Sequence, residues 1–383
     1  MADSKLQIAL TKASGRSRIS GDDRDLRLDA CRGLALWFVF IDHIPGNALD
    51  WLTIRNYGFS DASEVFVFVS GYTCMVSYGG TLRSRGWPTV VARSLRRSFE
   101  IYVAFLLLVI IYLALAWLSG SYLDETNTRR FFDDPGTALI RLLALQYAPV
   151  NTDILPTFVI LHLAFPIVLW LIARNAVIAL AASFMLYLMV QLYSWQMPAW
   201  PTGELYFNPF AWQILFVIGA CSAGPCATRF AGLMRHRATI PLAAAYVLFG
   251  LIVALSWRLD AFKWLIPRMV EDWLYPIYKS HLDPVRLIHF LAIVVLLTRF
   301  VPPDGHRPPG AWEKALIRCG ENSLPVFCLS VLASFVGFVV LNEVSDRLPM
   351  QAVVSALGIA LLVAISNLLT WEAKLGKRGP ELF

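Results

Sequence analysis

Ten apolar stretches run through the 383-residue sequence, and each approaches the length of a membrane crossing. A helix needs about 20 apolar residues to cross a hydrocarbon core of about 30 Å. Of all residues, 57% are hydrophobic and only 16% are charged. This pattern predicts an all-α polytopic integral membrane protein, because no single block holds the apolar residues. The predicted spans are residues 28–44, 64–80, 98–119, 154–173, 176–194, 210–223, 239–258, 284–301, 323–341 and 351–370.

Basic residues give these spans an orientation, because cytoplasmic loops of membrane proteins are enriched in Lys and Arg. With the N-terminus inside, and with Arg258, Arg286 and Arg299 at span ends counted with the adjoining segments, the cytoplasmic segments hold 22 Lys and Arg and the opposite segments hold 10. The outer segment 259–283 runs against this bias, since it is unusually basic. We expect both termini in the cytoplasm. The predicted parts are a basic arm (1–27), a membrane domain (28–370) and a tail (371–383).

The first apolar stretch carries four polar side chains that a plain membrane anchor would lack. It reads LDACRGLALWFVFIDHI and contains Asp29, Arg32, Asp42 and His43. In a helix, eleven residues span about three turns and about 16 Å, so Arg32 and His43 share one face at different depths. A charge inside a bilayer costs at least about 2.5 kcal/mol. We expect this face to meet a reaction site or a water-filled cavity, with a structural ion pair as the alternative.

Three motifs together resemble the membrane acyltransferase family 3 superfamily. They are the eleven-residue spacing of Arg32 and His43, EVFVFVSGY from Glu64 to Tyr72, and RSLRRSFEIY from Arg93 to Tyr102. Further motifs are similar to one branch, the OpgC-type osmoregulated periplasmic glucan succinyltransferases. These are RDLRLDACRG (24–33), IDHIPGN (41–47), RNYGFSDASEVFVFVSG (55–71), FNPFAWQ (207–213) and CGENSLPVF (319–327).

The resemblance implies a bacterial inner-membrane enzyme whose active site opens to the periplasm. Its reaction would move a succinyl group from cytoplasmic succinyl-CoA to hydroxyls of a periplasmic glucan, with acetyl as the alternative acyl group. Histidine suits the base of such a transfer, because its pKa lies near operating pH. His43, Asp42 and Arg32 are therefore the predicted catalytic residues. The residue that orients His43 stays open among Asp42, Asp61 and Glu64.

Other polar residues are candidates for holding the two substrates. Arg93, Arg96 and Arg97 follow the second span and could bind the phosphates of CoA. The succinyl carboxylate needs a cation, for which Arg55, Lys279 and Arg286 qualify, and Arg286 is favoured because it falls inside a span. The full set of predicted substrate-binding residues is Asp29, Arg55, Asn56, Asp61, Glu64, Ser70, Trp212, Gln213, Lys279 and Arg286.

The expected partners are the glucan acceptor, acyl-CoA and the lipid bilayer, without nucleic acid and without a metal. The six cysteines form no CxxC or Cys/His metal pattern. The sequence leaves the oligomeric state open, a homo-oligomer included. Two outer segments, 120–153 and 259–283, are rich in aromatic residues that would mark the membrane interface or a sugar-binding surface. Residues 137–150 are a candidate amphipathic surface helix. A proton-coupled transporter or a polysaccharide exporter is the alternative function, because buried His, Asp and Arg also mark ion pathways.

Overall fold

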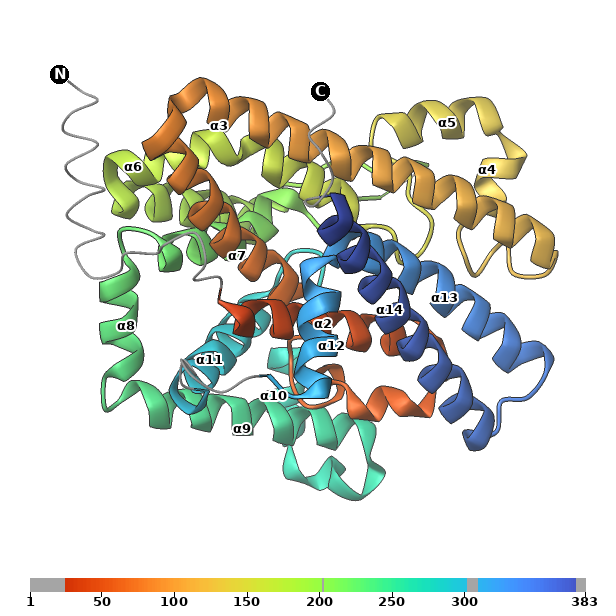
Figure 1. The fold of residues 1–383 in the computed structure, drawn as a ribbon. Coiled ribbons are helices and arrows are strands. Elements are labelled where there is room, and N and C mark those ends of the chain that lie inside the picture. The colour runs from red at the N-terminus through yellow and green to blue at the C-terminus, as the bar shows by residue number, and fades with distance from the viewer. Residues whose placement is uncertain (1–24, 202, 302–308, 377–383) are drawn as a thin grey trace. The chain divides into compact units, whose positions relative to one another are not determined.

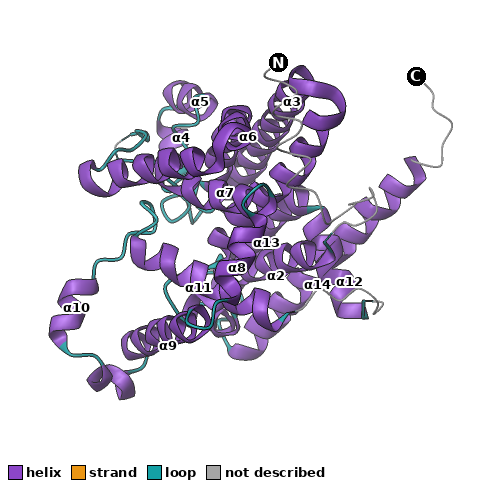
Figure 2. Ribbon diagram, turned by 90° about the vertical axis from the view of Figure 1, so that its left-hand side faces the viewer, coloured by secondary structure: helices purple, strands orange, loops and turns teal. Residues whose placement is uncertain are grey.

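The computed structural model describes residues 25–201, 203–301 and 309–376, which form helices joined by loops (Figures 1 and 2). The α-helices are α2 (Leu26–Asp42), α3 (Ala62–Ser119), α4 (Arg129–Asp133), α5 (Pro135–Leu143), α6 (Ile154–Tyr193), α7 (Pro209–Ala223), α8 (Ala227–Arg235), α9 (Thr239–Arg258), α10 (Arg268–Leu274), α11 (Pro284–Phe300), α12 (Ala311–Glu321), α13 (Ser323–Glu343) and α14 (Leu348–Gly376). Three short 3₁₀ helices are η1 (Ala48–Leu52), η2 (Ile54–Asn56) and η3 (Asp260–Leu265). The all-α prediction is confirmed for the described residues.

Five of the described helices are long and apolar enough to cross a membrane, namely α3, α6, α9, α13 and α14. A sixth crossing is added if α7 and α8, which meet at 97°, count as one broken span. These helices support the conclusion that the chain is a membrane protein. The ten crossings and the cytoplasmic location of both termini remain predictions. Most of the predicted basic arm (1–27) and the end of the tail lie outside the described residues.

Two helices are too long for one crossing, and each contains a break. α3 has 58 residues, which would extend about 87 Å as a continuous helix. Its backbone leaves helical geometry at Gly86, where φ is +76°, a conformation that glycine adopts readily. α6 has 40 residues and is broken at Asn175. Each helix therefore covers two predicted spans, 64–80 with 98–119 in α3 and 154–173 with 176–194 in α6.

The described residues divide into two compact units. The smaller unit contains residues 25–56, 61–65 and 309–376, and the larger contains 57–60 and 66–301. In the smaller unit, α2 packs against α12, α13 and α14, as Figure 1 illustrates. α12 was not among the predicted spans, because its sequence mixes apolar and charged residues. The helix that carries the predicted catalytic residues is thus the centre of the smaller unit.

Glycines allow α2 and its neighbours to approach at backbone distance. A Cβ on Gly33 of α2 would lie 1.9 Å from the Leu316 carbonyl oxygen of α12. A Cβ on Gly320 of α12 would lie 1.9 Å from the Asp29 carbonyl oxygen of α2. Small residues permit such close helix crossings, and any larger side chain would force the helices apart. The position of α2 against α12 is therefore fixed from both sides.

The larger unit repeats this device where α3 crosses α7. A Cβ on Gly71 would lie 1.9 Å from the Phe216 carbonyl oxygen, and one on Gly219 would lie 2.1 Å from that of Phe68. Gly71 belongs to the FVSGY motif, so its role here is to let two backbones meet. In the same unit, α9 packs against α11 and α6 against α7. Figure 2 shows α9 and α11 side by side.

α5 matches the predicted amphipathic surface helix, although it is shorter than the predicted range 137–150. Ala138 and Leu142 are buried, whereas Ile140 and Arg141 are exposed. Asp134 caps its N-terminus by accepting a hydrogen bond from the Thr137 N–H. One face of α5, with Ala138 and Leu142, therefore packs on the protein, while Leu139, Ile140 and Leu143 leave a largely apolar face accessible.

Candidate active site

Arg32 lies on α2 beside a buried carboxylate. Its Nη1 atom is 3.6 Å from Oδ1 of Asp29, and the two side chains are only 13% and 3% exposed. The charge of Arg32 is thus compensated one helical turn away on the same helix. Because the backbone of Asp29 also contacts Gly320, the ion pair lies at the crossing of α2 and α12. The structure brings Arg32 and Asp29 together, as their spacing suggests.

His43 follows directly at the C-terminus of α2. α2 is continuous from Leu26 to Asp42, and the backbone N–H of His43 donates to the Val39 carbonyl at 3.0 Å. The path from Arg32 to His43 is therefore helical, with a rise of about 16 Å, as the sequence predicts. His43 is partly buried. Its place at a helix end lets the imidazole reach groups that a residue inside the helix could not.

The neighbouring Asp42 is held by the loop that follows α2. Thr53 donates its hydroxyl to Asp42 Oδ1 at 2.7 Å. The Arg55 guanidinium donates to the Asp42 backbone carbonyl at 3.3 Å. Arg55 is exposed. This predicted carboxylate-binding cation therefore lies at the surface and contacts the residue that precedes His43. Sequence reasoning missed Thr53, whose hydroxyl fixes the carboxylate.

The loop between α2 and α3 is tied down by asparagines of the predicted motifs. Asn47 donates to Ser355 Oγ of α14 at 3.0 Å and also accepts from the Leu49 N–H at the start of η1. Asn56, predicted to contact substrate, donates to the Asp50 carbonyl at 2.6 Å and is fully buried. These bonds fix the loop that presents Arg55 and Thr53 to the end of α2.

Asp61 and Glu64 form a capping box at the start of α3. Asp61 Oδ1 accepts from the Ser63 N–H at 2.8 Å, and Glu64 Oε2 accepts from the Asp61 N–H at 2.9 Å. The spacing of three residues is typical of this motif, which satisfies helix N–H groups that lack an intrahelical partner. Both side chains are buried. They therefore have a defined structural role alongside the predicted site role.

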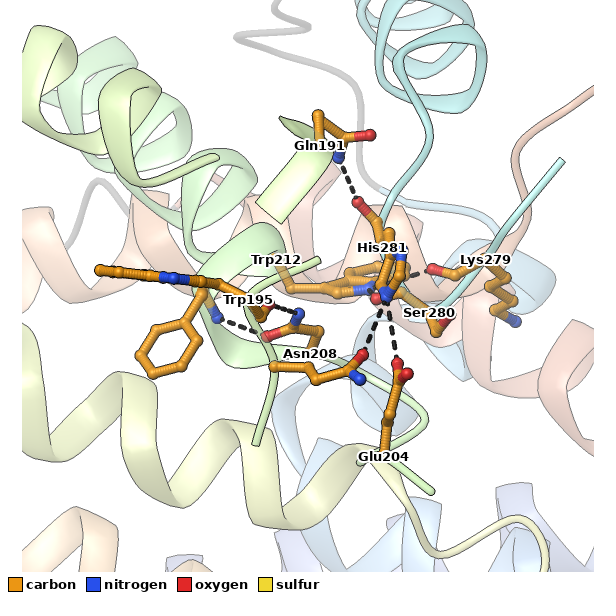
Figure 3. A network of polar contacts seen from close by, with 10 residues as sticks. Gln191, Trp195, Glu204, Asn208, Trp212, Lys279, Ser280 and His281 are labelled. Carbon is orange, nitrogen blue, oxygen red and sulfur yellow. Dashed lines mark hydrogen bonds and ion pairs between the residues drawn. The ribbon is translucent and has the colours of Figure 1, made fainter. Parts of the chain in front are cut away.

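The aromatic motif FNPFAWQ begins α7 and uses its polar groups within the larger unit. Trp212 is fully buried, and its indole N–H is shared between the carbonyls of Lys279 and Ser280 at 3.2 and 3.1 Å. Gln213 donates to the Ser183 carbonyl at 2.8 Å and accepts from the Ser183 hydroxyl at 2.6 Å. These groups join α7 to its neighbours, and Figure 3 shows the contacts of Trp212. Ser70 is partly buried, one residue before the Gly71 crossing.

Two predicted cations lie near the start of α11 in the larger unit. The ammonium of Lys279 lies 5.3 Å from the centre of the Phe207 ring. Arg286 is partly buried in the first turn of α11, whose N-terminus is capped by Asp283 through the Val285 N–H at 3.0 Å. The capping role of Asp283 explains its position three residues before Arg286.

Asp153 precedes α6 and is electrostatically linked to Lys279. Burial raises the pKa of Asp153 to about 7, although its own backbone N–H and the positive charge of Lys279 act in the opposite direction. The carboxyl group therefore titrates near neutral pH. Sequence reasoning did not single out Asp153, because a lone acidic residue at a helix start is typical of a cap.

The three predicted CoA-binding arginines differ in their surroundings. Arg96 and Arg97 are both paired with Glu100, at 3.0 and 3.2 Å. Arg93 instead donates to the Thr81 hydroxyl and to Ser77 Oγ, so it links the two parts of α3 on either side of Gly86. Glu100 was not predicted, although its spacing from Arg96 is that of a helical ion pair. The three arginines lie within about one and a half turns of α3.

His289 was not predicted as a site residue and anchors a motif in the larger unit. Its Nδ1 atom is 2.7 Å from the Ser60 hydroxyl oxygen. The ring fits against Gly58, where a Cβ would lie 2.2 Å from Nε2, and against Gly250, where a Cβ would lie 2.8 Å from Cδ2. The glycine of the RNYGFSD motif is therefore required by the histidine ring. No local sequence pattern links residues so far apart.

Comparison with known proteins places the sequence in a family. The sequence model described as OpgC protein matches residues 24–374, which is most of the chain. No similar protein was found among the curated proteins, and no similar fold among the solved structures. The resemblance to the OpgC branch is thus confirmed, and its members are linked to modification of osmoregulated periplasmic glucans by acyl transfer. The chain belongs to the OpgC protein family.

Proposed function

We propose that the protein is a membrane O-acyltransferase that moves a succinyl group from succinyl-CoA to a hydroxyl of a periplasmic glucan. Family membership supports the glucan acyltransferase class. The observation that carries the residue assignment is α2, which holds the compensated pair Arg32–Asp29 and ends at His43. In this arrangement Arg32 carries its charge within an apolar helix, and Asp29 compensates that charge.

In the proposed reaction, the hydroxyl oxygen of the glucan attacks the thioester carbonyl carbon of succinyl-CoA. Neutral His43 accepts the hydroxyl proton as the new C–O bond forms. The tetrahedral intermediate then collapses, the C–S bond breaks, and the leaving CoA sulfur takes the proton from the imidazolium. The products are a glucan succinyl ester and CoA, so every atom is accounted for without a further reactant.

Asp42 and its loop give His43 a fixed setting. The Thr53 hydroxyl and the Arg55 guanidinium both bind Asp42, so the residue before the base cannot rotate freely. A base must be positioned within hydrogen-bond reach of its proton, and small displacements cost rate. We assign Asp42 to positioning of the end of α2. Arg55 contacts the backbone of Asp42, the residue before His43, and can offer two parallel N–H groups to a carboxylate.

The donor's nucleotide end is assigned to Arg93, Arg96 and Arg97. CoA carries phosphates, and arginine forks suit them because each offers two parallel N–H donors. Glu100 neutralises part of this charge. A phosphate would compete with Glu100 for the same guanidinium groups. In this proposal the CoA site lies on the cytoplasmic side, where acyl-CoA is made, and the acylated hydroxyl on the periplasmic side of the inner membrane.

One assay separates this function from transport. Purified full-length protein in detergent is mixed with a periplasmic glucan fraction and succinyl-CoA labelled in the succinyl group. We expect label on the glucan, although no sealed compartment is present, which a proton-coupled transporter or an exporter could not produce. Unlabelled glucan with folded protein would contradict the proposal. Labelled acetyl-CoA in a parallel reaction shows whether acetyl, the alternative acyl group, is transferred.

A further inference from the structure

Four successive carbonyl groups before α11 are held by hydrogen bonds from α6 and α7, and Figure 3 shows the first three of them. Trp212 donates to the carbonyls of Lys279 and Ser280. Gln191 donates to the His281 carbonyl at 2.8 Å, and Tyr187 to the Leu282 carbonyl at 2.9 Å. These donors fix the backbone of residues 279–282, which forms no regular helix. Such support is typical of a segment whose side chains must stay in one place.

The fixed segment presents His281 to a carboxylate and an amide. His281 Nε2 lies 3.1 Å from Glu204 Oε2 and 3.3 Å from Gln196 Oε1. Because both neighbouring atoms are acceptors, Nε2 is the donor in these contacts, and Nδ1 is the ring nitrogen that lies outside them. Among the described residues, Nδ1 has no hydrogen-bond partner. The His281 and Glu204 side chains are 20% and 34% exposed, so both are accessible to a ligand.

Exposed aromatic rings lie on the same two segments as this polar pair. Tyr278 is 56% exposed, and its ring centre lies 6.1 Å from that of His281. Tyr206 and Trp195, on the loop that carries Glu204, are 50% and 53% exposed. Asn208 holds this loop by donating to the Trp195 carbonyl at 2.6 Å. Aromatic rings with polar edges suit ligands that have both apolar faces and hydroxyl groups.

The cluster lies outside the hydrocarbon region of a membrane. The loop from 194 to 208 and the segment from 275 to 283 have irregular backbone, which lipid-exposed protein does not tolerate. The partly exposed carboxylate of Glu204 gives the same indication, because a charge in lipid is costly. In the predicted topology, both segments are on the periplasmic side. The exposed rings therefore face an aqueous or interfacial phase in which a glucan is present.

We propose that His281, Glu204 and the exposed rings of Trp195, Tyr206 and Tyr278 on these two segments bind the glucan acceptor. Glu204 accepts hydrogen bonds from sugar hydroxyls, His281 Nδ1 accepts another, and the rings pack on the apolar faces of glucose units. This inference deepens the proposed function, since it names the acceptor-binding surface. His281 binds the acceptor here, whereas His43 acts on the reacting hydroxyl.

The test measures glucan binding without any acyl donor, so it is independent of catalysis. Full-length protein is placed in lipid nanodiscs, because maltoside detergents carry sugar headgroups that would compete. Linear and cyclic glucose oligosaccharides are titrated by calorimetry against the wild type, His281→Ala, Glu204→Gln and Tyr206→Ala. Trp371→Ala is the matched control, since Trp371 is 60% exposed and lies near the end of α14, outside both aromatic outer segments.

Each cluster variant is expected to weaken binding about tenfold, the usual effect of losing one good polar contact or ring. Trp371→Ala should bind like the wild type. In the acylation assay, the cluster variants should raise the acceptor KM while kcat and the donor KM stay within about twofold. Unchanged binding in all three cluster variants would overturn the proposal. So would equal weakening by Trp371→Ala, or loss of kcat in His281→Ala with unchanged binding, which would make His281 part of the reaction.

Discussion

Gly320 of α12 packs directly on the backbone of Asp29 in α2, so closely that a Cβ would lie 1.9 Å from the Asp29 carbonyl oxygen. The side chain of the same Asp29 compensates Arg32. The packing of α2 and the electrostatics of its charged face therefore meet at one residue. Any change that moves α12 also moves the ion pair.

Gly320→Ala should destabilise the protein, because the added methyl group meets backbone that cannot rotate away. Overpacking of this kind costs about 1–3 kcal/mol. The apparent Tm in detergent is the measurement. Gly80→Ala is the control, since a Cβ at Gly80 would meet nothing within 4 Å. An unchanged Tm for Gly320→Ala would show that the helices separate more easily than this contact implies.

Neutralising Arg96 and Arg97 together with Arg93 should raise the donor KM more than it lowers kcat. Phosphate contacts far from the reacting atoms contribute binding that is equal in the ground and transition states. The donor KM of the wild type should also rise with salt, which screens exposed charges. Steady-state kinetics with both substrates varied gives the answer.

Within that cluster, Arg93 is expected to differ, because it also links Thr81 and Ser77 to the far side of the Gly86 break. Arg93→Gln alone should lower the apparent Tm, whereas Arg96→Gln should leave it unchanged, since exposed ion pairs contribute little to stability. A change confined to the acceptor KM would rule out this cluster as the CoA site.

Asp153 should make stability depend on pH near neutrality. Its folded pKa is about 7, against 3.8 for an ordinary aspartate, so the folded protein binds the extra proton more tightly than the unfolded chain. The resulting stabilisation is complete below the unfolded pKa and is lost as pH rises through the folded pKa, up to about 4 kcal/mol in total. Asp153→Asn should therefore lose less Tm between pH 5 and pH 8, each about one unit or more from the folded pKa. Parallel curves for the two proteins would contradict the raised pKa.

The selection of succinyl over acetyl should depend on a cation. Burying the free carboxylate of succinyl without a partner is costly, so Arg55, Lys279 and Arg286 are each replaced by Gln. A competition between succinyl-CoA and acetyl-CoA gives the ratio of the two transfers. The right variant loses succinyl transfer selectively, and Arg286 was the residue favoured by sequence. The structure adds that Arg55 lies in the same unit as His43 and contacts Asp42. An equal ratio in all three variants would place carboxylate recognition elsewhere.

The sequence predicts helices well where apolar runs are long, and less well where their ends depend on partners. α2, α7 and α9 follow the predicted ranges closely, because hydrophobicity alone defines them. α12 was not predicted, since a short helix with mixed composition gains its stability from packing on α2. α3 and α6 each contain two predicted spans, and the breaks at Gly86 and Asn175 lie between those spans.

In the candidate site, too, features within one helix were predictable from sequence, whereas contacts between distant segments were not. The spacing of Arg32 and His43 was readable because both lie on one helix. Trp212 could not be assigned in this way, because the carbonyls that accept its N–H come from a loop more than sixty residues later. Asp61 and Glu64 attracted attention as acidic residues, although their spacing also matches a capping box. Contacts between distant segments, such as Ser60 with His289, leave no local pattern.

The most direct test of the account is the rate of succinyl transfer by His43→Ala. Loss of a general base should lower kcat about a hundredfold or more, while the apparent Tm and glucan binding stay near those of the wild type. His236→Ala is the control, since His236 is exposed at the end of α8 and has no proposed role. Transfer within a few-fold of the wild type by a correctly folded His43→Ala protein would contradict the central claim that His43 is the base.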